Sequence, residues 1–245
     1  MKEIIIPDGV TTIGENAYSG CSGLLSVTVP RSLRFVKNGA FGGCSNLGKV
    51  LIEDISQWFN IDFASESSTP LGYAKHLYNN DREITEIKIP DDVISIGPYA
   101  LYNNIGLSEL YIPKSVTSIG YKALYGCSGL KSIKVENKRP IKTEMFATDD
   151  IYTNCVLYVP EGSESAYYVA EGWKEFKNIK TYKEKATVAQ DTNGDGRVDT
   201  QDVIEIYYIM RNDLQDDIIE NYDVNGDGRI DTQDVLDIYQ YMQQH

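Results

Sequence analysis

A repeat of 23 residues constrains the first 180 residues of this chain more than any other feature. An Ile-Pro or Val-Pro pair marks the repeat, and its apolar residue falls at Ile6, Val29, Ile89, Ile112 and Val159. Two of these steps are 23 residues long, and one further step of that length reaches Ile52 and Val135. One such coil cannot bury its own apolar edge, whereas stacked coils share a continuous core. The spacing therefore predicts a solenoid of about seven coils, the third of them stretched to 37 residues.

Each repeat has the same internal order. A short alternating run, such as SVTVP or ELYIP, indicates one strand, and a VxxIGxxAF-like segment and a turn follow it. Because every coil adds a strand in the same direction, we expect an α/β repeat, a right-handed solenoid with one parallel sheet. One outward row of that sheet would hold Thr28, Leu51, Lys88, Tyr111, Lys134 and Tyr158. Its last four members are candidate ligand contacts, and an ordinary solvated sheet face is the alternative.

The repeat resembles the BspA-like (Treponema-type) leucine-rich repeats, from Met1 to about Lys180. The resemblance implies a leucine-rich-repeat solenoid over residues 1–182. It would end in a cap at about 156–180, where Trp173 and Phe176 cover the last coil. The N-terminal cap of the family has no counterpart here, so we expect the chain to be N-terminally truncated. Family members occur on secreted and surface proteins that bind other proteins or host molecules, which implies a recognition role.

Two further features of the repeats leave alternatives open. Cys21, Cys44 and Cys127 occupy one repeat position, which favours a ladder of buried thiols over disulfides, and Cys155 stands apart. The long third coil carries Trp58, Phe59, Phe63 and Tyr73. These aromatic residues are either the core of that coil or a second candidate ligand site, and we favour the core.

The C-terminal part of the chain is strongly acidic. Of the net charge of −13, residues 186–245 contribute 14 Asp and Glu against 3 Arg. Such a segment repels nucleic acid and anionic lipid, and it is either a solvated tail or a cation site. The stretch DTNGDGRVDTQD at 191–202 returns as DVNGDGRIDTQD at 223–234, with oxygen-bearing side chains at alternating positions. This spacing favours the cation site.

Both stretches carry the ligand order of an EF-hand-type calcium loop. The predicted ligands are Asp191, Asn193, Asp195, Arg197, Asp199 and Asp202 in the first loop, and Asp223, Asn225, Asp227, Arg229, Asp231 and Asp234 in the second. Each Arg would contribute its backbone carbonyl, and Gly196 and Gly228 permit the sharp turn at position 6. The sequence thus predicts two Ca²⁺ ions, with ion-free Asx-rich turns as the alternative.

An amphipathic helix is expected after each loop. Its apolar positions are Val203, Ile206, Tyr207 and Met210 after the first loop, and Val235, Ile238, Tyr239 and Met242 after the second. We expect Tyr207 and Tyr239 to pack between the two helices, and an exposed aromatic surface that contacts a partner is the alternative. Only 20 residues separate the loops, which is too few for a full entering helix as well as an exiting one. Each unit is therefore predicted to be a loop plus the helix that follows it.

This tandem loop-helix pattern resembles a type I dockerin over residues 187–245, after a linker at 183–186. The resemblance implies a small all-α domain with calcium-dependent folding that binds a cohesin on a scaffoldin. It implies cohesin contacts at loop positions 10 and 11 and along the exposed helix face: Thr200, Gln201, Ile204, Tyr208, Thr232, Gln233, Leu236 and Gln240. The familiar members carry Ser or Thr at both loop positions, so Gln leaves the cohesin class open. Because the two halves are near copies, we hypothesise two binding orientations.

The function expected from the whole sequence is that of a non-catalytic adaptor in a cellulosome-like complex. The chain contains no nucleophile, phosphate or dinucleotide motif and no apolar run long enough to span a membrane. The dockerin would bind a scaffoldin while the repeats display a protein- or glycan-recognition surface. The alternatives are a component of a polysaccharide-degrading enzyme and a cell-surface adhesin. Secretion to a surface complex of an anaerobic bacterium is the expected location.

Overall fold

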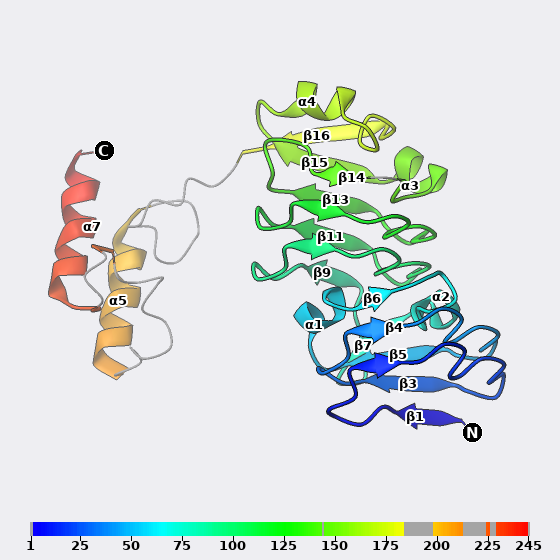
Figure 1. The fold of residues 1–245 in the computed structure, drawn as a ribbon. Coiled ribbons are helices and arrows are strands. Elements are labelled where there is room, and N and C mark those ends of the chain that lie inside the picture. The colour runs from blue at the N-terminus through cyan, green and yellow to red at the C-terminus, as the bar shows by residue number, and fades with distance from the viewer. Residues whose placement is uncertain (1, 144, 184–197, 213–223, 226–228, 245) are drawn as a thin grey trace. The chain divides into compact units, whose positions relative to one another are not determined.

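The computed structural model describes the chain except for residues 1, 144, 184–197, 213–223, 226–228 and 245 (Figure 1). Within helices, the side chains of residues 205, 207–209, 211 and 212 are also outside the described set. The chain divides into two compact units, Met1–Lys183 and Glu184–His245. The first unit is a stack of coils, and the second contains a pair of helices.

The described residues of the first unit form two five-stranded sheets. The first sheet consists of β1 (Glu3–Ile5), β3 (Ser26–Val29), β5 (Lys49–Ile52), β7 (Leu77–Asn79) and β8 (Arg82–Glu83). The second consists of β9 (Glu86–Lys88), β11 (Glu109–Ile112), β13 (Ser132–Val135), β15 (Val156–Pro160) and β16 (Asn178–Tyr182). All neighbouring strands are parallel except β7 and β8. The predicted solenoid of parallel strands is therefore confirmed.

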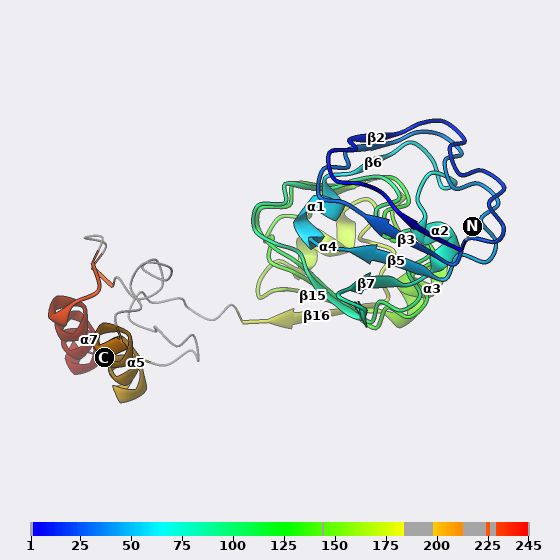
Figure 2. The ribbon, with the colours of Figure 1, turned by 90° about the horizontal axis from the view of Figure 1, so that it is seen from below.

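A second set of strands lies on the other side of the coils. It consists of β2 (Thr12–Ile13), β4 (Phe35–Val36), β6 (Asp62–Phe63), β10 (Ser95–Ile96), β12 (Ser118–Ile119) and β14 (Lys142–Thr143). Figure 2 shows the coils nearly superposed, with β2 and β6 across from β15 and β16. The VxxIG segments supply three of these strands, β2, β10 and β12. They are two residues long, which is too short for an alternating pattern to reveal them.

The prediction of one continuous sheet is wrong at the third coil. Ile52 pairs with Asn79, 27 residues further on, rather than with the strand that follows 37 residues later. A hairpin then turns the chain back, with Asn80 and Asp81 at φ of 46° and 60°. These left-handed residues fit a two-residue hairpin turn, because both of its central positions require positive φ. The antiparallel β8 ends the first sheet, and β9 begins the second.

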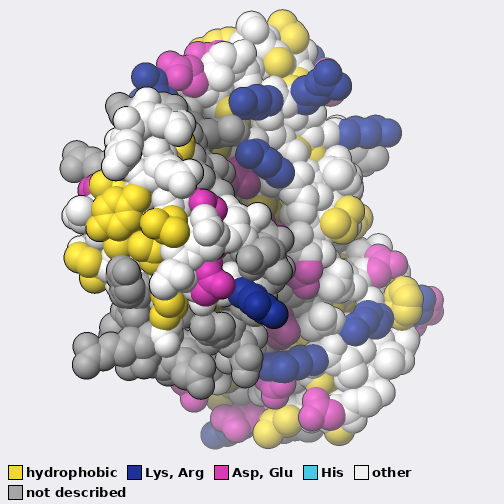
Figure 3. Space-filling model, turned by 90° about the vertical axis from the view of Figure 1, so that its left-hand side faces the viewer, with side chains coloured by type: hydrophobic (Ala, Val, Ile, Leu, Met, Phe, Trp, Pro, Cys, Tyr) yellow, Lys and Arg dark blue, Asp and Glu magenta, His cyan; other side chains and the backbone are white. Residues whose placement is uncertain are grey.

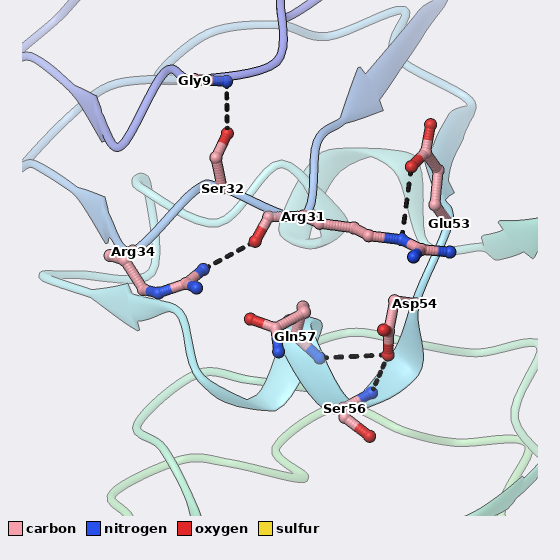
Figure 4. A network of polar contacts seen from close by, with 8 residues as sticks. All are labelled: Gly9, Arg31, Ser32, Arg34, Glu53, Asp54, Ser56 and Gln57. Atoms are coloured by element: carbon pink, nitrogen blue, oxygen red, sulfur yellow. Dashed lines mark hydrogen bonds and ion pairs between the residues drawn. The ribbon is translucent and has the colours of Figure 1, made fainter.

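The long third coil fills its own interior. It adds α1 (Ile55–Phe59), whose N-cap Asp54 accepts hydrogen bonds from the backbone N–H of Ser56 and Gln57 (Figure 4). It also adds α2 (Leu71–Ala74). The Trp58 indole is buried and donates to the Ala100 carbonyl at 2.8 Å. Because Phe59 and Phe63 are buried as well, these aromatic side chains belong to the core.

The cysteine ladder is a row of thiols. Cys44 and Cys127 are fully buried, and their Sγ atoms donate to the carbonyls of Tyr18 and Leu101 at 3.2 and 3.0 Å. All four cysteines are free, which favours the thiol interpretation over disulfides. Burial raises the pKa of Cys127 to about 12. Asn104 takes the ladder position one repeat before Cys127 and is itself fully buried.

Aromatic side chains close the end of the solenoid. The chain forms α3 (Asp149–Asn154) and α4 (Glu164–Val169) before its last strand, and Figure 1 shows α4 beside β16. Trp173 is fully buried and donates from its indole nitrogen to the Ile141 carbonyl at 2.8 Å. The centre of its ring lies 5.1 Å from the ring centre of Phe146 and 6.0 Å from that of Phe176. These rings complete the core where stacking of coils ends.

The second unit contains the two predicted helices, α5 (Thr200–Asn212) and α7 (Thr232–Gln244). Its small core, within the described residues, is made of Val203, Ile206, Ile230, Val235 and Ile238. Met210 and Met242 pack against that core. Each helix begins at loop position 10, as expected for a loop followed by a helix.

Candidate calcium-binding and recognition sites

The second acidic loop is tied to the start of α7 by one buried carboxylate. Asp234 is fully buried, and its Oδ2 accepts a hydrogen bond from the Asp231 N–H at 2.8 Å. Asp231 in turn accepts from the Gln233 N–H at 2.7 Å, which completes a reciprocal cap of the helix. The other oxygen of Asp234 accepts from the N–H groups of Val224 and Asn225 at 2.8 and 3.3 Å. The beginning and the end of the loop are therefore drawn together.

The first loop repeats the two hydrogen bonds at the start of its helix. Asp202 is fully buried and accepts from the Asp199 N–H at 2.8 Å, while Asp199 accepts from the Gln201 N–H at 2.8 Å. An acidic residue in the first helical turn also suits the positive end of the helix dipole. These two hydrogen bonds thus fall on equivalent residues of the two halves.

The donor set suits a hard cation such as calcium. The described predicted ligands are Asp199 and Asp202 in the first loop, and Asn225, Arg229, Asp231 and Asp234 in the second. The others, Asp191, Asn193, Asp195, Arg197, Asp223 and Asp227, lie outside the described residues. The second loop fits a cation because it is closed: the N–H of Asn225 at position 3 donates to the carboxylate of Asp234 at position 12. Closure brings the oxygen ligands of the two ends of the loop toward one ion. The described residues contain no group of three His, Cys, Asp or Glu that could hold a metal ion, at the loops or on the solenoid.

The candidate docking residues of the second unit are mostly exposed. Those on the surface are Thr200, Gln201, Ile204, Thr232, Gln233, Leu236 and Gln240. Ile204 is 55% exposed and Leu236 is 50% exposed, which is high for aliphatic side chains on a small folded unit. Figure 3 shows hydrophobic side chains gathered in a patch on this unit. The side chain of Tyr208 lies outside the described set.

The expectation that Tyr239 packs between the two helices is wrong, because its side chain is 43% exposed. Along α7 the inward positions are Asp234, Val235 and Ile238. Tyr239 follows Ile238 and therefore lies about 100° further around the helix. Tyr239 is a surface residue that the sequence pattern misassigned. The side chain of Tyr207 lies outside the described set.

On the solenoid, the four candidate ligand residues lie together. Lys88, Tyr111, Lys134 and Tyr158 line one hollow of about 400 Å³ in the outward face of the second sheet. Tyr182 from β16 also lines it, although the repeat pattern does not reveal this residue. Because Leu51 pairs with Tyr78, the predicted row does not continue directly from Leu51 to Lys88.

Tyr111 is held in place from several sides. Its hydroxyl donates to Glu136, and that carboxylate also accepts from the Lys114 N–H at 3.2 Å. Burial and this hydrogen bond raise the pKa of Tyr111, so its phenol stays protonated. The Lys88 and Lys134 ammonium groups lie 5.5 and 5.3 Å from the centre of its ring. The ring is therefore a fixed element of the hollow.

These features define a class of protein, a repeat solenoid followed by a paired loop-helix module of the calcium-binding kind. The family model for the BspA type Leucine rich repeat region matches residues 1–69 and 73–163, in six copies. This chain belongs to the BspA-type leucine-rich repeat family. The model for the Dockerin type I domain matches residues 189–243, so the chain also carries a type I dockerin. Type I dockerins bind calcium and imply a cohesin partner in a cellulosome-type assembly.

Several solved structures of bacterial leucine-rich repeat proteins are similar to this chain. One, from Bacteroides ovatus, is 23% identical with a TM-score of 0.42, over 74% of this chain and 43% of that one. A leucine rich cell surface protein from Faecalibacterium prausnitzii is 21% identical with a TM-score of 0.34, over 75% and 60%. A leucine-rich repeat protein of T. pallidum is 16% identical with a TM-score of 0.33, over 74% and 86%. This chain thus spans less than two thirds of the length of the Bacteroides ovatus and Faecalibacterium prausnitzii proteins.

No curated protein sequence matches the chain. The helices in the described part of the chain are all too short or too polar to cross a membrane. Both matched families are non-catalytic modules, and proteins that carry them are typically extracellular or attached to the cell surface.

Proposed function

We propose that this protein is a non-catalytic adaptor that binds a cohesin through its dockerin and a further ligand through its solenoid. The dockerin would hold two Ca²⁺ ions through the twelve loop residues named above. The solenoid would present a recognition surface that includes Lys88, Tyr111, Lys134 and Tyr158. The proposed location is an extracellular, surface-attached complex of an anaerobic bacterium.

One observation carries the docking half of this proposal. Each loop places an exposed Thr-Gln pair, Thr200-Gln201 or Thr232-Gln233, directly before a fully buried Asp. One turn further on, each helix exposes an aliphatic side chain, Ile204 or Leu236. Buried carboxylates fix the two pairs, while the exposed aliphatic residues offer apolar area to a partner. The equivalent halves support two binding orientations.

Binding of the full chain to a panel of immobilised cohesins, with calcium and with chelator, tests this function. We expect calcium-dependent capture by at least one cohesin. Replacing Thr200 and Gln201 by Ala should leave capture nearly unchanged, because the second half still presents its own pair. Replacing both pairs should abolish capture. A matched control is the replacement of the exposed pair Thr11-Thr12 by Ala in the solenoid. The docking proposal would be refuted if capture persisted in chelator. It would also be refuted if none of the cohesins captured the chain.

The enzymatic alternative makes a different prediction. If the chain degraded polysaccharide, the purified full chain would release reducing sugar from plant cell-wall polymers. The adaptor predicts no release above that of a heat-denatured sample. Reproducible release that survives purification would replace the adaptor with a hydrolase component.

A further inference from the structure

The second sheet carries an alternating row of lysine and tyrosine that extends beyond the four candidate residues. The members of this Lys–Tyr row, one from each strand, are Lys88, Tyr111, Lys134, Tyr158 and Lys180. Tyr111 pairs with Lys88 on one side and with Lys134 on the other, and Tyr158 pairs with Lys134 and Lys180. The alternation therefore crosses all five strands of the sheet without a break.

Two of the three lysines of this row, Lys88 and Lys134, lie over aromatic rings. The Lys134 ammonium lies 5.3 Å from the centre of the Tyr111 ring and 4.1 Å from that of Tyr182. Lys88 reaches Tyr111 from the opposite strand at 5.5 Å. Such contacts orient an ammonium group and remove part of its hydration without neutralising its charge. The ammonium groups are thereby positioned along the hollow.

Within the part of the chain that the structure describes, Lys88, Lys134 and Lys180 form no ion pair. The nearby Glu136 is engaged by the Tyr111 hydroxyl and the Lys114 N–H instead. Glu86 and Glu109 line the same hollow one row away, about 6.8 Å along the strands. The Lys–Tyr row is thus a line of unpaired positive charge beside a line of hydrogen-bond acceptors.

The spacing of the row distinguishes between kinds of anionic ligand. Neighbouring strands are about 4.8 Å apart, so lysines return about every 9.6 Å. An extended peptide returns a side chain to the same side about every 6.8 Å, which falls out of step with the lysines. A chain of pyranose rings linked through opposite corners advances by about one strand spacing per ring and presents the same edge at every second ring. Its acidic groups can therefore stay in step with the lysines.

We propose that the Lys–Tyr row binds a linear acidic polysaccharide that runs across the strands. The lysines pair with its carboxylate or sulfate groups, Tyr158 packs against a sugar ring, and Glu86 and Glu109 accept from its hydroxyls. This inference rests on the proposed function, since it names the ligand class of the solenoid face.

Titration calorimetry of the full chain with four probes tests the proposal. Polygalacturonate supplies carboxylates, its fully methyl-esterified form is the uncharged match, cellulose sulfate supplies sulfates, and polyglutamate is an acidic peptide. We expect polygalacturonate or cellulose sulfate, or both, to bind, and the difference between them identifies the acidic group. The methyl ester and polyglutamate should bind at least about 10-fold more weakly. Added salt should lower the affinity for the acidic glycan, because it screens the charges.

Two matched variants locate the site. Lys134→Gln should weaken glycan binding about 10-fold or more. Lys49→Gln is the control, because Lys49 lies on the first sheet, 5.2 Å from the centre of the Tyr78 ring, and the substitution removes the same charge. It should change binding less than about 2-fold. Unchanged melting of the solenoid shows that both variants fold.

Three results would overturn the inference: no binding of either acidic glycan, equal binding of the methyl ester, or equal loss in the two variants. Tighter binding of polyglutamate would assign the row to an acidic peptide instead. Calcium-dependent capture by cohesin is measured on the same samples. If capture succeeds while glycan binding fails, the adaptor function stands without this ligand.

Discussion

The two units of this protein are stabilised in different ways. The solenoid buries a continuous core that runs from Ile4 in the first coil to Phe176 in the cap. The described residues of the second unit bury only five hydrophobic side chains. Its loops instead concentrate carboxylates, two of which are fully buried and bonded to backbone N–H groups. The first unit is held by apolar burial between neighbouring coils, whereas the second depends on how its acidic loops are satisfied.

This difference separates the roles of the two units. A stack of coils keeps its shape whether or not a ligand is bound, so its outward face can serve as a preformed surface. A unit with a small core and many like charges folds only as far as those charges are compensated. Calcium would therefore control docking while leaving the recognition surface intact.

Removal of calcium should have the largest effect. We expect chelator to unfold the dockerin completely, because its loop carboxylates then repel one another, and to leave the melting of the solenoid unchanged. Differential scanning calorimetry of the full chain, with calcium and with chelator, measures both units in one sample. Magnesium added in place of calcium serves as the control. One transition that is the same in both conditions would show that the two units do not differ in this way.

Loss of the cap tryptophan should have the converse effect. Trp173→Ala removes a buried ring that contacts Phe146 and Phe176 and donates a hydrogen bond to Ile141. We expect it to destabilise the solenoid by about 3–5 kcal/mol, since large cavities of this kind relax only partly. Calorimetry should show a lower solenoid transition, with the calcium-dependent transition unmoved. Tyr168→Ala, at a side chain that is 56% exposed, is the control. A shift of both transitions would contradict the proposed independence.

A more limited change tests the loop carboxylate. Asp234→Asn keeps the shape of the side chain but replaces an oxygen that accepts N–H donors. We expect a loss of about 2–3 kcal/mol in the dockerin, because hydrogen bonds to a buried charged group are lost. Calcium titration followed by circular dichroism measures it. Asp237→Asn is matched in chemistry, but within the described residues the Asp237 carboxylate accepts a hydrogen bond only from the Gln233 side chain, at 3.0 Å. Equal effects of the two substitutions would remove the special role of Asp234.

Alkaline pH should have the smallest effect, confined to the solenoid. The unfolded Cys127 thiol loses its proton near pH 9.0, whereas burial raises its folded pKa to about 12. The stability that this neutral thiol contributes is present below pH 9.0 and is lost as the pH rises toward 12. Melting of the solenoid at pH 8 and pH 10.5, compared with the same measurement on Cys127→Ala, isolates this thiol. If the variant loses as much stability as the parent chain, the thiol has no part in the effect.

The repeat made much of the solenoid predictable. A constant step of 23 residues places Val29 beside Ile52 and Ile112 beside Val135, and the register has both pairs. The pattern failed where the step changed, because nothing local shows that Leu51 pairs with Tyr78. It also gave no sign of Lys180 or Tyr182, since β16 lies outside the repeat.

The loops show a similar division. The order of Asp and Asn along the chain is enough to predict an oxygen site and a following helix, because both depend on neighbouring residues. It could not assign Tyr239, whose exposure depends on how the two helices face each other.

The sequence by itself determined that coils stack, that two acidic loops are each followed by a helix, and which side chains alternate on each strand. Those properties are local or repeat at a fixed interval, so the order of residues contains them. Only the tertiary structure decided where the sheet divides, which aromatic rings fill the core and which lysines lie unpaired over tyrosine. Those outcomes depend on contacts between residues far apart in the chain, whose partners are chosen by packing and not by spacing.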